Sequence, residues 1–173
     1  MTQQTELERA HSLIREVPNY PIQGVLFRDI TPLLADAAAF RATTDALIEP
    51  FLGQFDVVAG IEARGFLLSG AAAIASGTGT VPIRKAGKLP LPAGRAEYAL
   101  EYGTAAIDMH ADLPKGTRFL LVDDVLATGG TLRAAKGLVE DLGYTVAGIA
   151  ALFEIPELGG RALVGDVHTV FSD

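Results

Sequence analysis

An apolar run followed by two acids and a glycine-threonine loop occupies residues 119–131, and it limits the folds open to this chain. The run Phe119 to Val122 is typical of a strand buried on both faces of a parallel sheet. Asp123 and Asp124 follow it directly. Successive side chains of a strand point to opposite faces, so both acids can serve one ligand only if the strand ends about there. We therefore predict the carboxyl end of a parallel strand, where open α/β sheets bind their ligands.

The next residues form a loop suited to a phosphate group. The loop contains two glycines, which permit close backbone approach, and two hydroxyl side chains; its members are Ala127, Thr128, Gly129, Gly130 and Thr131. Apolar residues recur at helical spacing over 132–142, so the loop opens a helix whose first N–H groups can bind an anion. Carboxylates suit sugar hydroxyls or Mg²⁺. The whole stretch therefore indicates a ribose 5-phosphate site, whereas a plain surface turn would not need this ordered combination.

Two other phosphate-binding motifs are excluded by the order of residues. The nucleoside-triphosphate loop needs a Gly-Lys pair followed by Ser or Thr, but Leu89 follows Gly87 and Lys88 here. The dinucleotide fingerprint needs three spaced glycines after a strand and an acid about 20 residues later. The nearest stretch, residues 77–82, lacks the third glycine, and the acids at 123 and 124 precede their glycines. A dinucleotide-dependent oxidoreductase is therefore disfavoured.

The acid pair and the Ala-Thr-Gly-Gly-Thr loop resemble the 5-phosphoribosyl diphosphate (PRPP) loop of type I phosphoribosyltransferases. Further segments resemble the adenine-specific members of that family, and they are residues 24–32, 60–66, 83–90 and 98–103. The resemblance spans nearly the whole chain. It implies a pentosyltransferase of purine salvage that transfers the phosphoribosyl group of PRPP to N9 of adenine, giving AMP and pyrophosphate, with Mg²⁺ held mainly by the diphosphate.

The residues that would bind the diphosphate are basic. Arg64 follows a predicted strand, so its guanidinium should lie at the same sheet edge as Asp123, where it could bind a diphosphate bidentately. Arg84, Lys85 and Lys88 form a basic cluster, which alone would indicate only a solvated face. The resemblance implies that this cluster contacts pyrophosphate, with Lys85 and Lys88 reaching it across a dimer interface or within one chain.

The resemblance also implies residues for the base and for proton transfer. The segment Leu26, Phe27 and Arg28 matches the adenine-binding strip, where the Phe27 ring can stack on a purine while main-chain groups read its edge. Glu101 matches a loop glutamate that acts as general base, and Tyr102 helps to close the site. Taken alone, Glu101 could equally be a solvated strand residue.

Alternation of strand and helix patterns predicts one α/β domain over residues 1–173, built on a twisted, mostly parallel sheet flanked by helices. Expected strands include 25–30, 57–61, 81–85, 118–122, 146–153 and 164–171; expected helices are 7–17, 36–51, 66–76 and 132–142. Residues 1–35 would form a small N-terminal hood that binds the base. Residues 86–112 would form a flexible antiparallel flap.

Composition limits the partners of the chain. A net charge of −7 disfavours nucleic acid and anionic membranes, which need a basic surface. The start of the chain is too polar for a signal peptide, no stretch is long and apolar enough to span a membrane, and the absence of cysteine is compatible with the cytoplasm. We expect a cytoplasmic homodimer that binds small molecules.

Two alternative functions are compatible with the same PRPP loop. A phosphoribosyltransferase for 6-oxopurines, namely hypoxanthine, guanine or xanthine, would differ in the base strip. A non-catalytic PRPP-binding regulator would need a DNA-binding module, for which the chain offers little room before Pro18.

Overall fold

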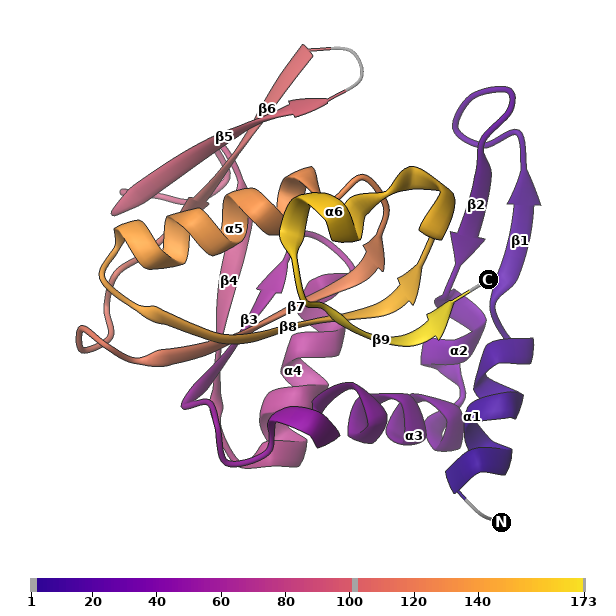
Figure 1. Cartoon of the computed structure of the whole chain (residues 1–173). Coiled ribbons are helices and arrows are strands. Elements are labelled where there is room, and N and C mark those ends of the chain that lie inside the picture. The colour runs from indigo at the N-terminus through magenta and orange to yellow at the C-terminus, as the bar shows by residue number, and fades with distance from the viewer. Residues whose placement is uncertain (1–2, 101–102, 173) are drawn as a thin grey trace. The chain divides into compact units, whose positions relative to one another are not determined.

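The computed structural model describes residues 3–100 and 103–172 (Figure 1). The chain divides into two compact units, Met1–Ala46 and Leu47–Asp173. None of the helices in these described ranges has the length and apolar character needed to cross a bilayer.

The first unit combines short helices with a two-stranded sheet. Its elements are α1 (Gln3–Ser12), β1 (Arg15–Pro18), β2 (Leu26–Asp29), α2 (Thr31–Ala35) and α3 (Ala37–Ile48), the last of which continues into the second unit. The two strands pair antiparallel, with Arg15 opposite Asp29 and Pro18 opposite Leu26. The predicted continuation of the first helix to residue 17 is wrong, because residues 15–18 pair with β2 instead.

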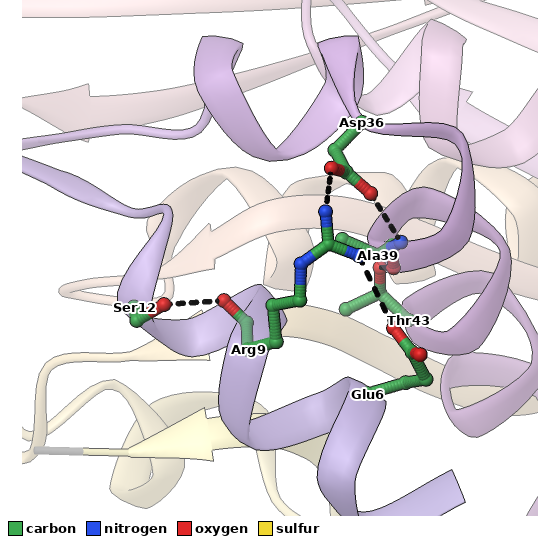
Figure 2. A network of polar contacts seen from close by, with 6 residues as sticks. All are labelled: Glu6, Arg9, Ser12, Asp36, Ala39 and Thr43. Carbon is green, nitrogen blue, oxygen red and sulfur yellow. Dashed lines mark hydrogen bonds and ion pairs between the residues drawn. The ribbon is translucent and has the colours of Figure 1, made fainter. Parts of the chain in front are cut away.

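A polar network links α1 to the start of α3 within this unit (Figure 2). The Arg9 guanidinium forms ion pairs with Glu6, at 3.4 Å, and with Asp36. The other carboxylate oxygen of Asp36 accepts a hydrogen bond from the Ala39 amide at 3.0 Å, which caps α3. The Thr43 hydroxyl donates to the Ala39 carbonyl one turn earlier.

The second unit is built on a seven-stranded sheet in the order β5-β6-β4-β3-β7-β8-β9. Its strands are β3 (Val57–Ile61), β4 (Gly79–Lys85), β5 (Gly94–Leu100), β6 (Gly103–Met109), β7 (Arg118–Leu126), β8 (Thr145–Glu154) and β9 (His168–Ser172). The five strands from β4 to β9 in this order are parallel, while β6 pairs antiparallel with both β4 and β5. The predicted mostly parallel sheet and antiparallel flap hairpin are therefore confirmed.

Helices cover both faces of this sheet (Figure 1). They are η1 (Glu49–Phe51), α4 (Gly65–Ser76), α5 (Gly130–Asp141), η2 (Pro156–Leu158) and α6 (Gly160–Val164). The chain passes from β3 through α4 to β4 in one direction along the sheet, and from β7 through α5 to β8 in the other. Right-handed crossovers in opposite directions place α4 and α5 on opposite faces. The order of the strands thus reverses between β3 and β7, where α/β sheets form their ligand-binding crevice.

The strand expected over 164–171 is partly wrong. Val164 ends the short helix α6, and the last strand begins only at His168. The core lies between the sheet and α5, where buried side chains of β3, β7 and β8 meet Leu132, Ala135, Leu138 and Val139.

Candidate active site

The carboxyl ends of β3 and β7 lie side by side at the reversal point. Gly60 of β3 pairs with Val122 of β7, and this is the last pair between the two strands, with β3 ending one residue later at Ile61 and β7 continuing to Leu126. Gly60 also permits close packing of α4, because an added Cβ atom would lie 2.2 Å from the Ser69 hydroxyl and 2.5 Å from the Gly65 carbonyl. Residues 62–65 therefore begin at a fixed position, because β3 before them is buried and α4 packs closely against β3.

The acid pair does not follow the end of its strand, although the sequence had indicated that it would. The ladder between β7 and β3 ends at Val122, but on the other side β7 stays paired with β8 through Leu126. Asp123 and Asp124 consequently lie within β7. They nevertheless line one cavity, together with the loop that follows the strand.

This cavity, of about 170 Å³, is bounded by the acid pair and by the predicted phosphate loop, whose members are Ala127, Thr128, Gly129, Gly130 and Thr131. Gly129 has a φ of +83° at the start of α5, a conformation that favours glycine. The loop packs closely against Gly160, where an added Cβ atom would lie 2.3 Å from the Ala127 carbonyl oxygen. The first residues of the twelve-residue helix α5 thus line a small cavity, and the start of a helix is a suitable anion site.

The acid pair carries strong electrostatic interactions. Burial and the neighbouring charge of Asp124 raise the pKa of Asp123 well above its ordinary value, although Arg64 opposes the shift. The Asp123 carboxylate accepts a hydrogen bond from the Asp124 amide at 2.9 Å. Arg64 forms an ion pair with Asp124 at 2.6 Å, so the structure places it at the sheet edge expected from the sequence. The two carboxylates and the guanidinium therefore form one charged cluster.

The basic cluster after β4 lies around the carboxylate of Glu62. Lys88 Nζ lies 2.8 Å from one oxygen of this carboxylate, and the Lys85 amide and the Arg84 side chain lie 3.0 Å and 3.4 Å from the other. Burial opposes ionisation of Glu62, but the hydrogen bonds from Lys88 and Lys85 outweigh it and lower its pKa. The structure therefore brings Arg84 and Lys88 together through an acid for which the sequence had given no such role.

The predicted base-binding strip lies in β2 of the first unit. Leu26 is exposed, whereas Phe27 and Arg28 are half-buried. The Phe27 ring packs edge-on against Tyr20 with centroids 5.2 Å apart, and Arg28 forms an ion pair with Glu16 at 2.9 Å. The Leu26 side chain is therefore accessible from solvent within this unit.

The predicted catalytic pair, Glu101 and Tyr102, lies outside the described residues. The strands on either side of it, β5 and β6, pair from Gly94 opposite Met109 to Leu100 opposite Gly103. The β5 strand also packs on α5, since an added Cβ atom at Gly94 would lie 2.9 Å from the Leu138 side chain.

Sequence reasoning missed two groups of residues beside the site. The buried acid Asp108 of β6 binds Arg95 and the Gly87 amide, and its signal was an acid inside an otherwise apolar strand. Gly160 supports the phosphate loop, and its signal was the unexplained Gly159-Gly160 pair.

Comparisons with known proteins place this geometry in a family. Residues 33–167 match the model of the phosphoribosyl transferase domain. The chain is 58% identical over 157 residues to the adenine phosphoribosyltransferase of Arthrobacter sp. (strain FB24), a match that covers 90% of this chain and 85% of the relative.

Solved structures agree with this match. The adenine phosphoribosyltransferase of Rhodothermus marinus is 45% identical, with a TM-score of 0.92 over 98% of this chain and 99% of that one. The enzyme of Saccharomyces cerevisiae, solved with adenine and an imino-altritol bisphosphate, is 34% identical with a TM-score of 0.91 over 96% and 99%. The chain therefore belongs to the phosphoribosyltransferase family and, within it, to the adenine phosphoribosyltransferases.

Proposed function

We propose that this chain transfers the phosphoribosyl group of PRPP to N9 of adenine, releasing pyrophosphate and forming AMP. The observation that carries the proposal is the cavity that joins the acid pair to the loop at the start of α5. A ribose 5-phosphate needs hydroxyl acceptors and an anion site a few ångströms apart, and this cavity offers both. Membership of the adenine phosphoribosyltransferases supports the choice of base.

The loop and the acid pair would bind different parts of the sugar phosphate. Backbone N–H groups and the hydroxyls of Thr128 and Thr131 would donate to the 5-phosphate, assisted by the positive end of the α5 dipole. Asp123 and Asp124 would accept hydrogen bonds from the ribose hydroxyls. Because Asp123 is desolvated in the folded chain, a hydroxyl donor would compensate a charge that is otherwise poorly stabilised.

The diphosphate would be bound by Arg64 and by the basic cluster of Arg84, Lys85 and Lys88. A guanidinium can bind phosphate oxygens bidentately, while lysine ammonium groups act as mobile point charges. Arg64 pairs with Asp124 beside the ribose cavity, so one arginine can link the sugar and diphosphate subsites.

The residues present fit a Mg²⁺ ion that arrives with the substrate. Mg²⁺ prefers oxygen ligands, keeps several waters and is usually held by one or two carboxylates together with substrate phosphates. Within residues 3–100 and 103–172 no group of three or more His, Asp or Glu side chains is arranged as a metal site. Asp123 and Asp124 supply carboxylate oxygens beside the cavity, which suits a metal held mainly by the diphosphate. When bound, the ion would act as a Lewis acid that neutralises the departing diphosphate.

The base would be bound by the strip in β2, where the Phe27 ring can stack on a purine and main-chain groups can read its edge. Glu101 would accept the proton that adenine loses from N9, and Tyr102 would help to exclude water that could hydrolyse the activated sugar. These two roles come from the resemblance of the flap to the family pattern.

We also propose a cytoplasmic homodimer that uses the outer face of α4. Leu67 and Ile74 are 56% and 85% exposed, and residues seven apart lie on the same face of a helix. A second copy of the chain would bury this apolar face. Size-exclusion chromatography with light scattering should give twice the chain mass, and Ile74→Lys should lower it to one chain, whereas Leu158→Lys at another exposed position should not.

A panel of nucleobases tests the substrate assignment. With Mg²⁺ and PRPP the protein should convert adenine to AMP and leave hypoxanthine, guanine and xanthine essentially untouched. Comparable turnover of a 6-oxopurine would refute the adenine assignment, and no turnover with PRPP binding intact would instead indicate a regulator. A second test is Glu101→Gln, which should lower kcat far more than it changes the affinity for PRPP, while an unchanged kcat would remove Glu101 from the mechanism.

A further inference from the structure

Asp108 is a fully buried acid that joins three segments around the flap. It lies on β6, between strands β5 and β4, directly opposite Arg95 of β5 on one side and Arg84 of β4 on the other. Its carboxylate accepts two hydrogen bonds from Arg95, from Nε at 2.7 Å and from Nη2 at 2.9 Å. The oxygen that binds Nη2 also accepts the Gly87 amide at 3.1 Å. One side chain therefore contacts the flap strand β5 and the turn that follows β4.

The turn held by Asp108 carries the cations proposed for the diphosphate. It runs from Lys85 to Lys88 and is closed by a hydrogen bond from the Lys88 amide to the Lys85 carbonyl at 3.2 Å. Glu62 binds its two ends, and Asp108 binds its middle at Gly87. The position of both lysines thus depends on two carboxylates, and of these Asp108 also binds Arg95 of strand β5.

The interactions of Asp108 leave little freedom for independent movement. The side chain has 0% exposure, so an ionised carboxylate is tolerable only while its donors stay in place. Hydrogen bonds from Arg95 outweigh burial and hold the pKa of Asp108 below its ordinary value. A displacement of the turn that moved this carboxylate would therefore require Arg95, and with it β5, to follow.

We propose that Asp108 is a positioning residue that couples the turn from Lys85 to Lys88 to strand β5, so that diphosphate bound at Lys85 and Lys88 orders this strand, which leads to Glu101. The inference rests on the proposed diphosphate role of these lysines. Strand β5 continues from Arg95 to Leu100, the residue before Glu101. An extended strand transmits a constraint at Arg95 along its length, which is roughly 16 Å to Leu100 at about 3.3 Å per residue.

Arg95→Gln is the decisive variant, because it removes the flap contact and leaves the bond between Gly87 and Asp108. Asp108 then keeps the Gly87 amide as its donor, so Arg95→Gln should lower the free energy of unfolding, and calorimetry is used first to establish that the variant is folded at the temperature of the experiment. Hydrogen exchange would be followed with inorganic pyrophosphate and Mg²⁺ as the probe. In the wild type, pyrophosphate should slow exchange in residues 94–100. Pyrophosphate should bind Arg95→Gln within about twofold of the wild-type affinity, yet it should no longer slow exchange in residues 94–100 of this variant. The kcat of Arg95→Gln should fall about tenfold.

Further variants separate coupling from a general loss of stability. Arg118→Gln is the matched control, since Arg118 binds Asp56 through Nε at 3.1 Å and Nη2 at 2.6 Å at the opposite end of the parallel strands. It should leave kcat and the pyrophosphate-induced protection unchanged. Arg95→Lys should recover part of the lost kcat and part of the lost pyrophosphate-induced protection. Asp108→Asn should lower both in the same way and, in addition, raise the KM for PRPP.

Two results would overturn the inference: full protection of residues 94–100 in pyrophosphate-bound Arg95→Gln, or no pyrophosphate-induced protection there in the wild type. The binding experiment requires neither adenine nor turnover. A failure of the coupling is therefore distinguishable from a failure of the proposed reaction, which the nucleobase panel tests separately.

Discussion

Gly160→Ala should damage the phosphate loop without touching any ligand directly. The added Cβ atom would lie 2.3 Å from the Ala127 carbonyl oxygen and 3.0 Å from the Gly129 amide nitrogen. Ordinary contact begins at 3.4 Å, so the loop or the start of α6 must move by about 1 Å. Both partners are backbone atoms and cannot rotate away. A misplacement of about 1 Å can cost on the order of 100-fold in rate, and overpacking of this kind costs about 1–3 kcal/mol of stability.

Gly159→Ala provides the matched control at the adjacent position. Gly159 has a φ of +66°, but its added Cβ atom would meet nothing within 4 Å. This variant should lose about 1–2 kcal/mol of stability through backbone strain while keeping an intact loop. The two alanines thus separate the effect of stability from the effect of loop position.

Steady-state kinetics and calorimetry at a temperature well below both melting points would measure the difference. Gly160→Ala should lose on the order of 100-fold in kcat/KM for PRPP and should bind ribose 5-phosphate weakly, while pyrophosphate still binds. Gly159→Ala should stay within about threefold of wild type in both measurements, since strain at a left-handed backbone position acts on folding and not on the cavity. Wild-type affinity for ribose 5-phosphate in Gly160→Ala would refute the assignment of this loop to the 5-phosphate.

Further predictions concern acids. Because the pKa of Asp123 is raised, its ionisation destabilises the fold increasingly as pH rises above 3.8. Asp123→Asn should therefore raise Tm at pH 7.5, by about 2–4 °C for each kcal/mol of stability gained, and should not raise it below pH 3.8. The same variant should weaken PRPP binding. The hydrogen bonds from Arg118 lower the pKa of Asp56 to about 2, so this carboxylate stabilises the fold above pH 3.8 and loses that effect as pH falls toward 2. NMR titration of Asp56 should give a midpoint at about 2, and Arg118→Gln should return the midpoint toward 3.8. Asp36→Ala removes the cap of α3 and should lower the free energy of unfolding by about 1 kcal/mol in chemical denaturation. Asp36→Asn keeps a capping oxygen and should retain most of this stability.

Patterns confined to one element predicted that element well. The expected strand 57–61 matches β3 because all its residues are buried, which makes them a continuous apolar run. The helix after the phosphate loop was predicted from apolar residues at helical spacing, and these are the residues that α5 buries against the sheet. In both cases burial on defined faces leaves a periodic signal that can be read from a short window of the chain.

Features that depend on a distant partner could not be predicted in the same way. The acids at 123 and 124 suggested the end of a strand, but β8 keeps β7 paired past the point where β3 stops. Residues 15–17 were predicted as the end of a helix, yet residues 15–18 pair as a strand with residues 26–29. The contacts of Glu62 with Lys88 and of Asp108 with Arg95 join residues 26 and 13 positions apart. No local window contains both members of such a pair.

The charges of the site explain how an acidic chain can bind a polyanionic substrate. Arg64, Arg84 and Lys88 each pair with a carboxylate, at Asp124 or at Glu62, so the cations of the site are held in place by acids. Without these acids, neighbouring cations would repel one another, and their long side chains would lose more conformational entropy when a ligand ordered them. A diphosphate carries more negative charge than a single carboxylate and can exchange for it at short range. The net charge of −7 is therefore compatible with anion binding, since recognition depends on a few prearranged cations rather than on the charge of the whole surface.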